Sequence, residues 1–306
     1  MKVVEHLVGI ETQDMSRELT QKLGDLRAVL HDLPVPIYPC KSKAQGQLDI
    51  LQRILNQAIE HWLCDVLGWT SQAKVSALVG GLDHGTIDFV AQLPDTRLVV
   101  VEVQLGNGGR GSRDYEKIRE VHRAGKLALG VVVVFTHATA KRVDRGLGTF
   151  EALVKSSGRQ ADMPICLLGL DAQATPVYDF SCVPWLPSAQ ILGGHGGPGS
   201  FEVQAQLARQ MLEGVEPAQL SLCAAHRQVV AQLEQRYFRA LSRGLVLDVE
   251  RAVRSADAST LRALGQILAQ QGERIAQALQ LSTVPLRASG AGPSNAELYA
   301  SPRLCA

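Results

Sequence analysis

Two acidic residues, Asp88 and Glu102, are spaced so that they could meet across a β-hairpin. Directly opposed side chains in a hairpin have Cβ atoms roughly 4.5–5.5 Å apart, and like charges at that distance repel. Such carboxylates raise each other's pKa or bind a cation. Oxygen ligands of this kind suit Mg²⁺ or Mn²⁺, so the pair is a candidate metal site. Gln104 would share its face, because side chains alternate along a strand.

The hairpin is predicted from the local sequence. Residues 86–93 and 97–105 are rich in Val, Ile and Phe, and Pro94-Asp95-Thr96 between them favours a turn. If the strands pair directly beside this turn, the two acids lie opposite each other. The other face of both strands carries only apolar side chains and is expected to join a core. A surface hairpin with two unrelated acids is the alternative, and this apolar face argues against it.

At this point the residues resemble a known motif. Ile87-Asp88 with Val101-Glu102-Val103-Gln104 is similar to the PD-(D/E)XK nuclease superfamily, in which an acid on one strand and acid-x-lysine on the next bind a divalent metal. Gln104 stands where lysine is usual, and this E-x-Q variant resembles BglII-like type II restriction endonucleases. The resemblance runs from about Glu60 to Leu170. It implies a Mg²⁺-dependent endonuclease, with Mn²⁺ as a possible substitute, that cuts double-stranded DNA alongside a companion methyltransferase.

The resemblance also implies roles for single residues. Asp88 and Glu102 would hold the metal, with the Val103 carbonyl as a third oxygen, and Gln104 would position the attacking water. In this superfamily an acid on the helix before the hairpin often joins the metal site, which makes Glu60 a further candidate ligand. A solvated glutamate on a helix surface is the alternative for that position.

Basic residues gather just after the hairpin, in a glycine-rich run and the predicted helix that follows it. Arg110 and Arg113 are candidate contacts to DNA phosphates beside the metal site. Lys117 could reach across from the helix and replace the missing motif lysine. Lys41 and Lys43, in an earlier loop, are further candidate phosphate contacts. A solvated helix face or loop is the alternative in each place.

A competing pattern overlaps the same region. Gly106, Gly108 and Gly111 fit G-x-G-x-x-G between a predicted strand and a predicted helix, the context of a dinucleotide-binding turn. Against it, Thr136-His137 follows the next strand where an acid would bind a ribose, and buried parallel strands seldom carry an acid. A dinucleotide-binding enzyme is therefore the second hypothesis. A nuclease-fold module that binds without catalysis is the third, and the intact acids favour activity.

The order of predicted elements gives the fold class. From residue 47 it reads helix, three strands, helix, strand, helix, strand, and consecutive strands favour antiparallel pairing while helical crossovers favour parallel pairing. The prediction is an α/β fold, a mixed β-sheet flanked by helices with a restriction-endonuclease-like αβββαβ core and a C-terminal helical segment. The predicted helices are 11–33, 47–67, 112–126 and 138–155, and the predicted strands are 73–79, 86–93, 97–105, 130–135 and 163–170.

Beyond residue 192 the character of the sequence changes. We expect a nuclease-like domain with N-terminal helices over 1–192, a glycine-rich linker over 193–200, a helical segment over 201–281 and a disordered tail over 282–306. The helical segment carries apolar stripes that need a partner surface. Because a cut through both strands of a palindrome calls for two active sites, we expect a homodimer in which this segment helps form the interface or clamps DNA.

Composition sets wider bounds on function. The chain has 306 residues, 46% hydrophobic and 20% charged, with a net charge of +1, so any DNA binding must come from local basic patches. Six cysteines without a C-x-x-C pair argue against a zinc site and a disulfide framework. The charged N-terminus is unlike a signal peptide, and no apolar run is long enough to span a membrane, so a cytoplasmic location without membrane contact is expected.

Overall fold

The computed structural model describes residues 1–39, 41, 47–80, 85–106, 111–144, 146–160, 162–173, 175–186, 189–193 and 200–255. The chain divides into two compact units. The first consists of Met1–Tyr178 with Ala208–Gly214, and the second of Asp179–Leu207 with Val215–Ala306. The candidate site lies within the first unit, which is built around a mixed β-sheet.

Six strands form this sheet in the order β1-β7-β6-β5-β4-β3. β5, β6 and β7 are parallel neighbours, whereas β3–β4, β4–β5 and β1–β7 are antiparallel. The strands are β1 (Lys2–Val8), β3 (Thr70–Lys74), β4 (Thr86–Gln92), β5 (Leu98–Gln104), β6 (Leu127–Phe135) and β7 (Ile165–Asp171). Two short strands, β2 (Val35–Ile37) and β8 (Val177–Asp179), pair separately.

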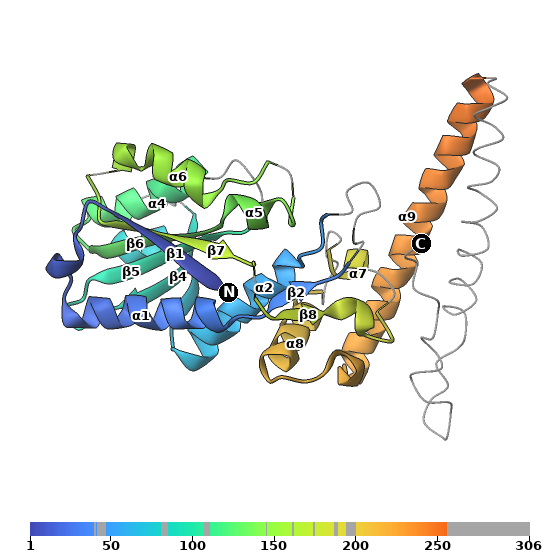
Figure 1. Cartoon of the computed structure of the whole chain (residues 1–306), viewed down its shortest axis with the longest axis horizontal. Coiled ribbons are helices and arrows are strands. Elements are labelled where there is room, and N and C mark those ends of the chain that lie inside the picture. Colours follow the sequence, from blue (N-terminus) through green and yellow to red (C-terminus); the bar gives the residue numbers. More distant parts are fainter. Residues whose placement is uncertain are drawn as a thin grey trace. The chain divides into compact units, whose positions relative to one another are not determined.

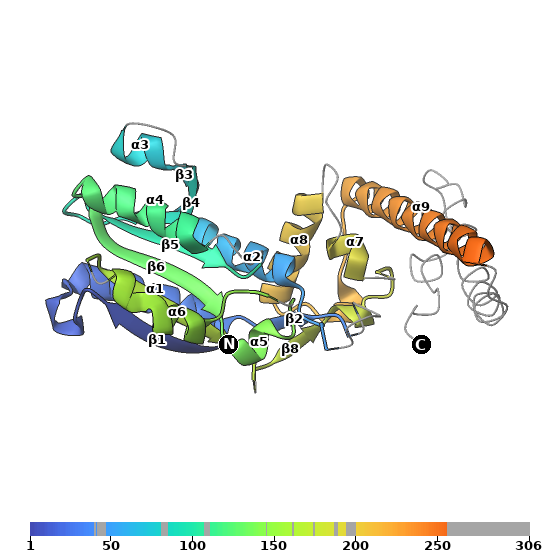
Figure 2. The ribbon, with the colours of Figure 1, turned by 90° about the horizontal axis from the view of Figure 1, so that it is seen from above.

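Helices cover both faces of the sheet, with α4 and α6 on one face and α1 on the other (Figure 1). α3 continues from β3 at the edge of the sheet (Figure 2). The helices of this unit are α1 (Arg17–Asp32), α2 (Gln52–Glu60), α3 (Val75–Val79), α4 (Gly111–Arg123), α5 (His137–Ala140) and α6 (Phe150–Ser156), with 3-10 turns η1 (Thr12–Asp14) and η3 (Ser157–Gln160). α2 runs on as a π-helical stretch, η2 (His61–Val66).

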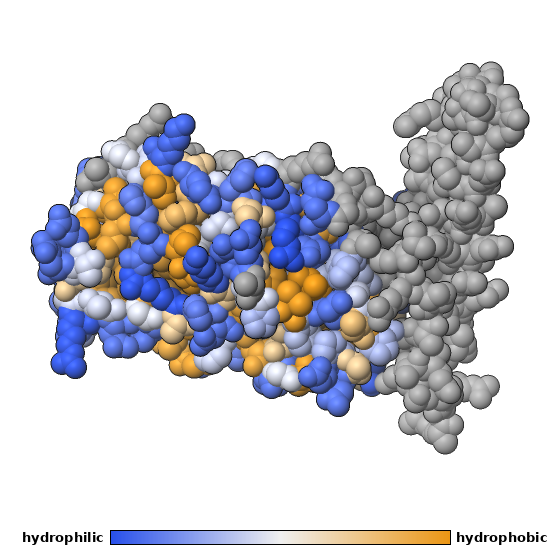
Figure 3. Space-filling model, in the orientation of Figure 1, coloured by the Kyte–Doolittle hydropathy of each residue, from blue (hydrophilic) through white to orange (hydrophobic). Residues whose placement is uncertain are grey.

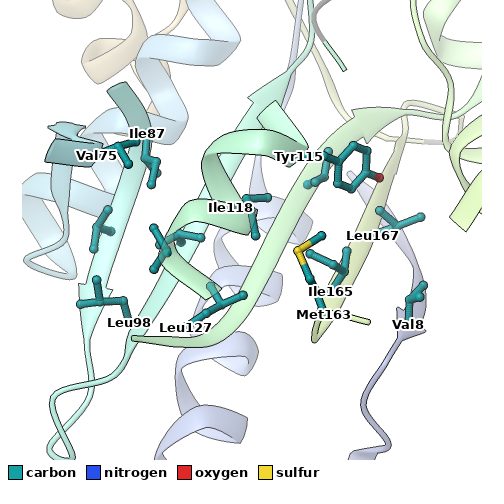
Figure 4. Packing of buried hydrophobic residues seen from close by; sticks show 14 of the residues in the cluster. Val8, Val75, Ile87, Leu98, Tyr115, Ile118, Leu127, Met163, Ile165 and Leu167 are labelled. Carbon is teal, nitrogen blue, oxygen red and sulfur yellow. The ribbon is translucent and has the colours of Figure 1, made fainter. Parts of the chain in front are cut away.

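Helix α4 is held on the sheet by an apolar stripe. Tyr115, Ile118 and Val121 lie at a spacing of three residues, which brings them to one side of the helix. They join the core cluster with strand residues such as Leu98, Val132 and Ile165, as Figure 4 shows for several members. β6 is buried along its whole length because both faces of a parallel sheet are covered. The packing of this stripe fixes which other residues of α4 face the sheet.

Glycine at position 130 lets α4 approach the sheet closely. A Cβ atom on Gly130, in β6, would lie 2.6 Å from Ile118 Cγ2 and 2.8 Å from Ile165 Cδ1. Contacts under 3 Å do not occur without displacement of the neighbours. The position of α4 over β5 and β6 therefore depends on this glycine.

The second unit is helical. It contains η4 (Phe180–Cys182), α7 (Ala189–Gly193), η5 (Pro217–Gln219) and the long helix α9 (Ala224–Ser255), and α8 (Ser200–Leu212) contributes its first part. Trp185 Nε1 donates to the Leu220 carbonyl at 3.0 Å, and Gln204 Nε2 donates to the Leu192 carbonyl at 2.6 Å. The predicted tail and residues 256–281 of the predicted helical segment lie outside the described residues.

The mixed sheet flanked by helices confirms the predicted fold class. α2, β3, β4, β5, α4 and β6 form the predicted αβββαβ core, with the short helix α3 inserted between β3 and β4. The strand pairs β3–β4 and β4–β5 are antiparallel, and β5 and β6, joined by α4, are parallel. The predicted strand over 73–79 is wrong beyond residue 74, because Val75–Val79 is helical and only the preceding residues form β3. A short apolar run does not distinguish a strand from a buried helical turn.

Two further elements differ from the expectation. β1 was not predicted and adds an antiparallel edge strand next to β7. The predicted helix over 138–155 is two helices, α5 and α6. Gly146 between them has φ +86°, a left-handed conformation that cannot continue an α-helix.

The surface of the chain is mixed. On the face shown in Figure 3, hydrophilic and hydrophobic side chains are interspersed over the described residues. Within the described part of the chain, no helix combines the length and the apolar character needed to cross a membrane.

Candidate active site

The two acids lie where the β4–β5 ladder ends. The strands pair in the predicted register as far as Phe89 opposite Val101, one position before Asp88 and Glu102. If the pairing continued, the Val103 N–H of β5 would donate the next interstrand hydrogen bond to a backbone carbonyl of β4. It donates instead to the side-chain oxygen Oδ2 of Asp88, at 2.8 Å. A carboxylate thus replaces a backbone partner at this point, and it is fixed beside β5 by that bond.

Asp88 is held from its other side by β3. Gln72 Nε2 donates to Asp88 Oδ1 at 3.2 Å, and Gln72 Oε1 accepts from the Thr86 hydroxyl at 3.1 Å. Gln72 has φ +50°, which is uncommon for a residue other than glycine. The neighbours of Gln72 pair with Phe89 and Ile87, so Gln72 stands opposite Asp88 in this register.

Glu102 is almost completely buried, since only 2% of its side chain is exposed. Its Oε1 lies 2.7 Å from the Lys117 ammonium, which extends from α4 and is 13% exposed. Lys117 Nζ also lies 2.8 Å from Asp114 Oδ1 and donates to the Thr86 carbonyl at 2.9 Å. Lys117 therefore ties α4 to both strands of the hairpin.

Gln104 contacts the same helix through Asp114. Its Nε2 donates to Asp114 Oδ2 at 2.8 Å, so one carboxylate takes up both the Gln104 amide and the Lys117 ammonium. Asp114 is buried, and it precedes Lys117 by three residues, the spacing that places two side chains together on a helix. Four side chains thus form one connected cluster between α4 and β5: Glu102, Gln104, Asp114 and Lys117.

Burial controls the electrostatics of this cluster. Burial and then the charge of Asp88 raise the pKa of Glu102 from 4.5 to about 8, against the opposing effect of Lys117. Burial acts to lower the pKa of Lys117, but its contacts with Asp114 and Glu102 outweigh this effect and raise the pKa above the ordinary 10.5. Lys117 therefore stays charged, whereas Glu102 is harder to ionise than an ordinary glutamate. Strongly perturbed pKa values of this kind gather at functional sites.

The donor set fits a small divalent cation. Glu102 Oε1 is buried and is paired with the Lys117 ammonium 2.7 Å away. The Val103 carbonyl lies on the same side of β5 as its N–H, beside Asp88, because the two groups of one residue share an edge of a strand. No group of three or more His, Cys, Asp or Glu that could hold a metal occurs in the described part of the chain. Mg²⁺ is commonly bound through one or two carboxylates together with water and substrate phosphates, and two carboxylates are compatible with this pattern.

The sequence that contains this site matches a known protein family. The family model for restriction endonucleases BglII and BglIII matches residues 13–170, more than half of the chain. The chain belongs to the BglII/BglIII restriction endonuclease family. The match includes every residue of the cluster described above, and it confirms the resemblance seen in the E-x-Q sequence.

A crystal structure of restriction endonuclease BglII complexed with a DNA 16-mer is similar in structure, with 16% sequence identity and a TM-score of 0.46. The match covers 58% of this chain and 88% of that chain. None of the curated proteins matches the chain.

Membership of an endonuclease family leaves the dinucleotide hypothesis without support. Its structural context was nevertheless correct, because β5 and β6 are parallel and α4 connects them. β5 is one of the few buried parallel strands that carry an acid, because Lys117 compensates the charge of Glu102. A Cβ atom on Gly106 would lie 2.3 Å from Nε2 at the end of the Gln52 side chain, which would have to move. Gly108 lies outside the described residues.

Two other predicted site residues, Glu60 and Lys41, make contacts outside the cluster. Glu60 accepts from Gln57 Nε2 at 3.1 Å, and the described residues contain no metal-binding group that unites it with the two acids. Lys41 is turned inward, where its ammonium donates to the carbonyls of Ile50 at 2.6 Å and Val143 at 3.2 Å. These contacts give Lys41 a structural role in joining two loops. They do not favour the phosphate contact that the sequence suggested.

Arg113 is exposed on α4 and remains a candidate phosphate contact. Arg110 and Lys43 lie outside the described residues. Sequence reasoning gave no role to Asp114 or Gln72, which hold Gln104 and Asp88. The spacing between Asp114 and Lys117 could have indicated the first, whereas nothing in the sequence marks the turned backbone of Gln72.

Proposed function

We propose that this endonuclease is Mg²⁺-dependent, with Mn²⁺ as a substitute, and cleaves phosphodiester bonds in double-stranded DNA as a type II restriction enzyme. The observation that carries the proposal is the buried Glu102 carboxylate, paired with the Lys117 ammonium, beside Asp88 at the end of the β4–β5 ladder. A buried carboxylate with this raised pKa is costly to ionise unless a cation neutralises it. The E-x-Q sequence of the family is the second support.

Asp88 and Glu102 would hold the ion, with the Val103 carbonyl as a third oxygen. When bound, a divalent cation lowers the pKa of water and offsets negative charge on the scissile phosphate. Asp88 is already oriented for this role, because the Val103 N–H and Gln72 fix both of its oxygens. Glu102 is oriented by its burial, and it would lose its proton when the ion binds.

In enzymes with an acid-x-lysine motif, one lysine both orients the water and supplies positive charge. Here Gln104 would take the first of these roles and Lys117 the second. Gln104 is a neutral amide, so it can orient a water molecule but cannot supply a positive charge. Lys117 supplies that charge from α4, within 2.7 Å of Glu102, and would stabilise the developing negative charge of the transition state. Two residues on different elements thus replace one residue of the motif.

The DNA partner follows from the family and from the chemistry of a phosphodiesterase. Arg113, exposed on α4, would contact a phosphate beside the cleavage site. The described residues of one chain contain one Asp88–Glu102 pair, so a concerted cut of both strands needs two chains, and we propose a homodimer. A companion methyltransferase would protect the host DNA at the same sequence, and both enzymes would act in the cytoplasm.

Incubation of purified protein with unmethylated plasmid DNA tests the proposal. We expect discrete fragments with Mg²⁺ or Mn²⁺ and none with EDTA, resolved on an agarose gel. A linearised plasmid of defined ends would support a sequence-specific double-strand cut. Cleavage that persists in excess EDTA would contradict the metal-dependent mechanism.

A further inference from the structure

Asp114 makes two contacts that together decide how Gln104 is presented. Its Oδ1 lies 2.8 Å from the Lys117 ammonium, and its Oδ2 accepts from Gln104 Nε2 at 2.8 Å. The Asp114 side chain is 10% exposed, so water competes little for either oxygen. It lies in the first turn of α4, which the packing of Ile118 and Val121 sets firmly on the sheet.

This arrangement matters because a glutamine amide has two ends of nearly equal shape and opposite hydrogen-bonding character. Nε2 only donates and Oε1 only accepts, so a rotated amide would offer a donor where an acceptor is needed. An ionised carboxylate can only accept, so its partner must turn Nε2 toward it. With Nε2 bound to Asp114, Gln104 keeps Oε1 available as an acceptor for a water hydrogen.

We propose that Asp114 is a positioning residue that fixes the orientation of the Gln104 amide and thereby determines that Gln104 accepts from the nucleophilic water. The inference rests on the proposed function, since the water belongs to the hydrolytic reaction. Asp114 also holds the Lys117 ammonium, so one carboxylate aligns both groups that stand in for the motif lysine.

A polarity swap tests this. In Asp114→Asn, the side chain at position 114 keeps one oxygen and gains an NH₂ group. The oxygen accepts from Lys117, which can only donate, so the NH₂ group faces Gln104. Gln104 must then rotate to accept with Oε1 and presents a donor to the site. We expect the single-turnover cleavage rate to fall about 10- to 100-fold, the usual effect of losing a group that orients a ligand or catalytic residue.

Adding Gln104→Glu to Asp114→Asn reverses the polarity of the pair and restores an acceptor, at the net charge of the native protein. We expect this double variant to cleave about tenfold faster than Asp114→Asn alone. Gln104→Glu alone places two carboxylates together and should be slow. Glu116→Gln is the matched control, because Glu116 lies on the same helix with its side chain 56% exposed.

A second readout needs neither metal nor DNA. In a ¹H–¹⁵N correlation spectrum of the metal-free protein, the side-chain amide signals of Gln104 are those missing from Gln104→Glu. We expect them to move in Asp114→Asn and to stay in place in Glu116→Gln, with circular dichroism spectra unchanged in all variants. This result would show that Asp114 orients the amide in the resting protein.

Unmoved Gln104 signals in Asp114→Asn would overturn the proposal. A double variant no faster than Asp114→Asn would overturn it as well, because a purely structural role of Asp114 predicts no rescue. If the native protein showed no metal-dependent cleavage, the function itself would be refuted, and this outcome is read from the native protein alone.

Discussion

Replacing Glu102 with glutamine should change how the stability of the metal-free protein depends on pH. Glu102 is 2% exposed, and burial raises its pKa from 4.5 to about 8. Glutamine has the shape of the protonated glutamate but cannot ionise. The variant therefore removes one titration and leaves the packing beneath α4 in place.

The sign and size follow from proton linkage. Between pH 4.5 and about 8 the folded protein keeps a proton on Glu102 that the unfolded chain has released, so stability falls as the pH rises through this window. The contribution is fully present below pH 4.5 and is lost as the pH passes about 8. Each pH unit costs about 1.4 kcal/mol, and the whole window about 5 kcal/mol. Glu102→Gln should thus be about 3–5 kcal/mol more stable than the native protein at pH 8.

Guanidinium unfolding followed by circular dichroism, in EDTA at pH 5, 6.5 and 8, measures this difference. We expect the native midpoint to fall with pH and that of Glu102→Gln to change little, with the Glu116→Gln control following the native protein. Adding Mg²⁺ at pH 8 should stabilise the native protein and not Glu102→Gln, because the ion binds the ionised form. Parallel pH dependence of the native protein and Glu102→Gln would refute the reasoning.

Three further predictions concern the amide, the packing of α4 and assembly. Gln104→Ala should slow single-turnover cleavage about 10- to 100-fold, less than Asp88→Asn, and equal losses would mean that Gln104 does more than orient water. Gly130→Ala should lower stability by about 1–3 kcal/mol, because a Cβ atom would lie 2.6 Å from Ile118, and Gly148→Ala, with open space around it, should not. Light scattering should give a dimer for the protein bound to DNA. A monomer that nicks one strand at a time would rule out the dimeric enzyme.

The part of the site that could be predicted from sequence is the part fixed by local geometry. A three-residue turn set the register of β4 and β5, and strand alternation then placed Glu102 and Gln104 on one face. The residues that resemble the nuclease motif, Asp88 and Glu102-Val103-Gln104, lie within the same hairpin. These features needed no knowledge of how distant elements pack.

What could not be predicted depends on packing between elements. The sequence suggested that Lys117 could reach the hairpin, but it gave no such role to Asp114. Both contacts depend on the apolar stripe that sets the rotation of α4 on the sheet, which consists of Tyr115, Ile118 and Val121. Helical spacing shows which residues share a side of the helix, but the facing surface is decided by tertiary contacts. The inward turn of Lys41 likewise depends on carbonyls of two loops that are distant in sequence.

The cleavage rate of variants in the two acids tests the central claim most directly. Asp88→Asn and Glu102→Gln preserve the shape of each side chain and remove the negative charge that would hold Mg²⁺. We predict that each lowers the single-turnover rate of DNA cleavage by several orders of magnitude, while Glu116→Gln cuts at the native rate and all three remain folded. Near-native cleavage by either acid variant would contradict the assignment of Asp88 and Glu102 as the metal-binding pair.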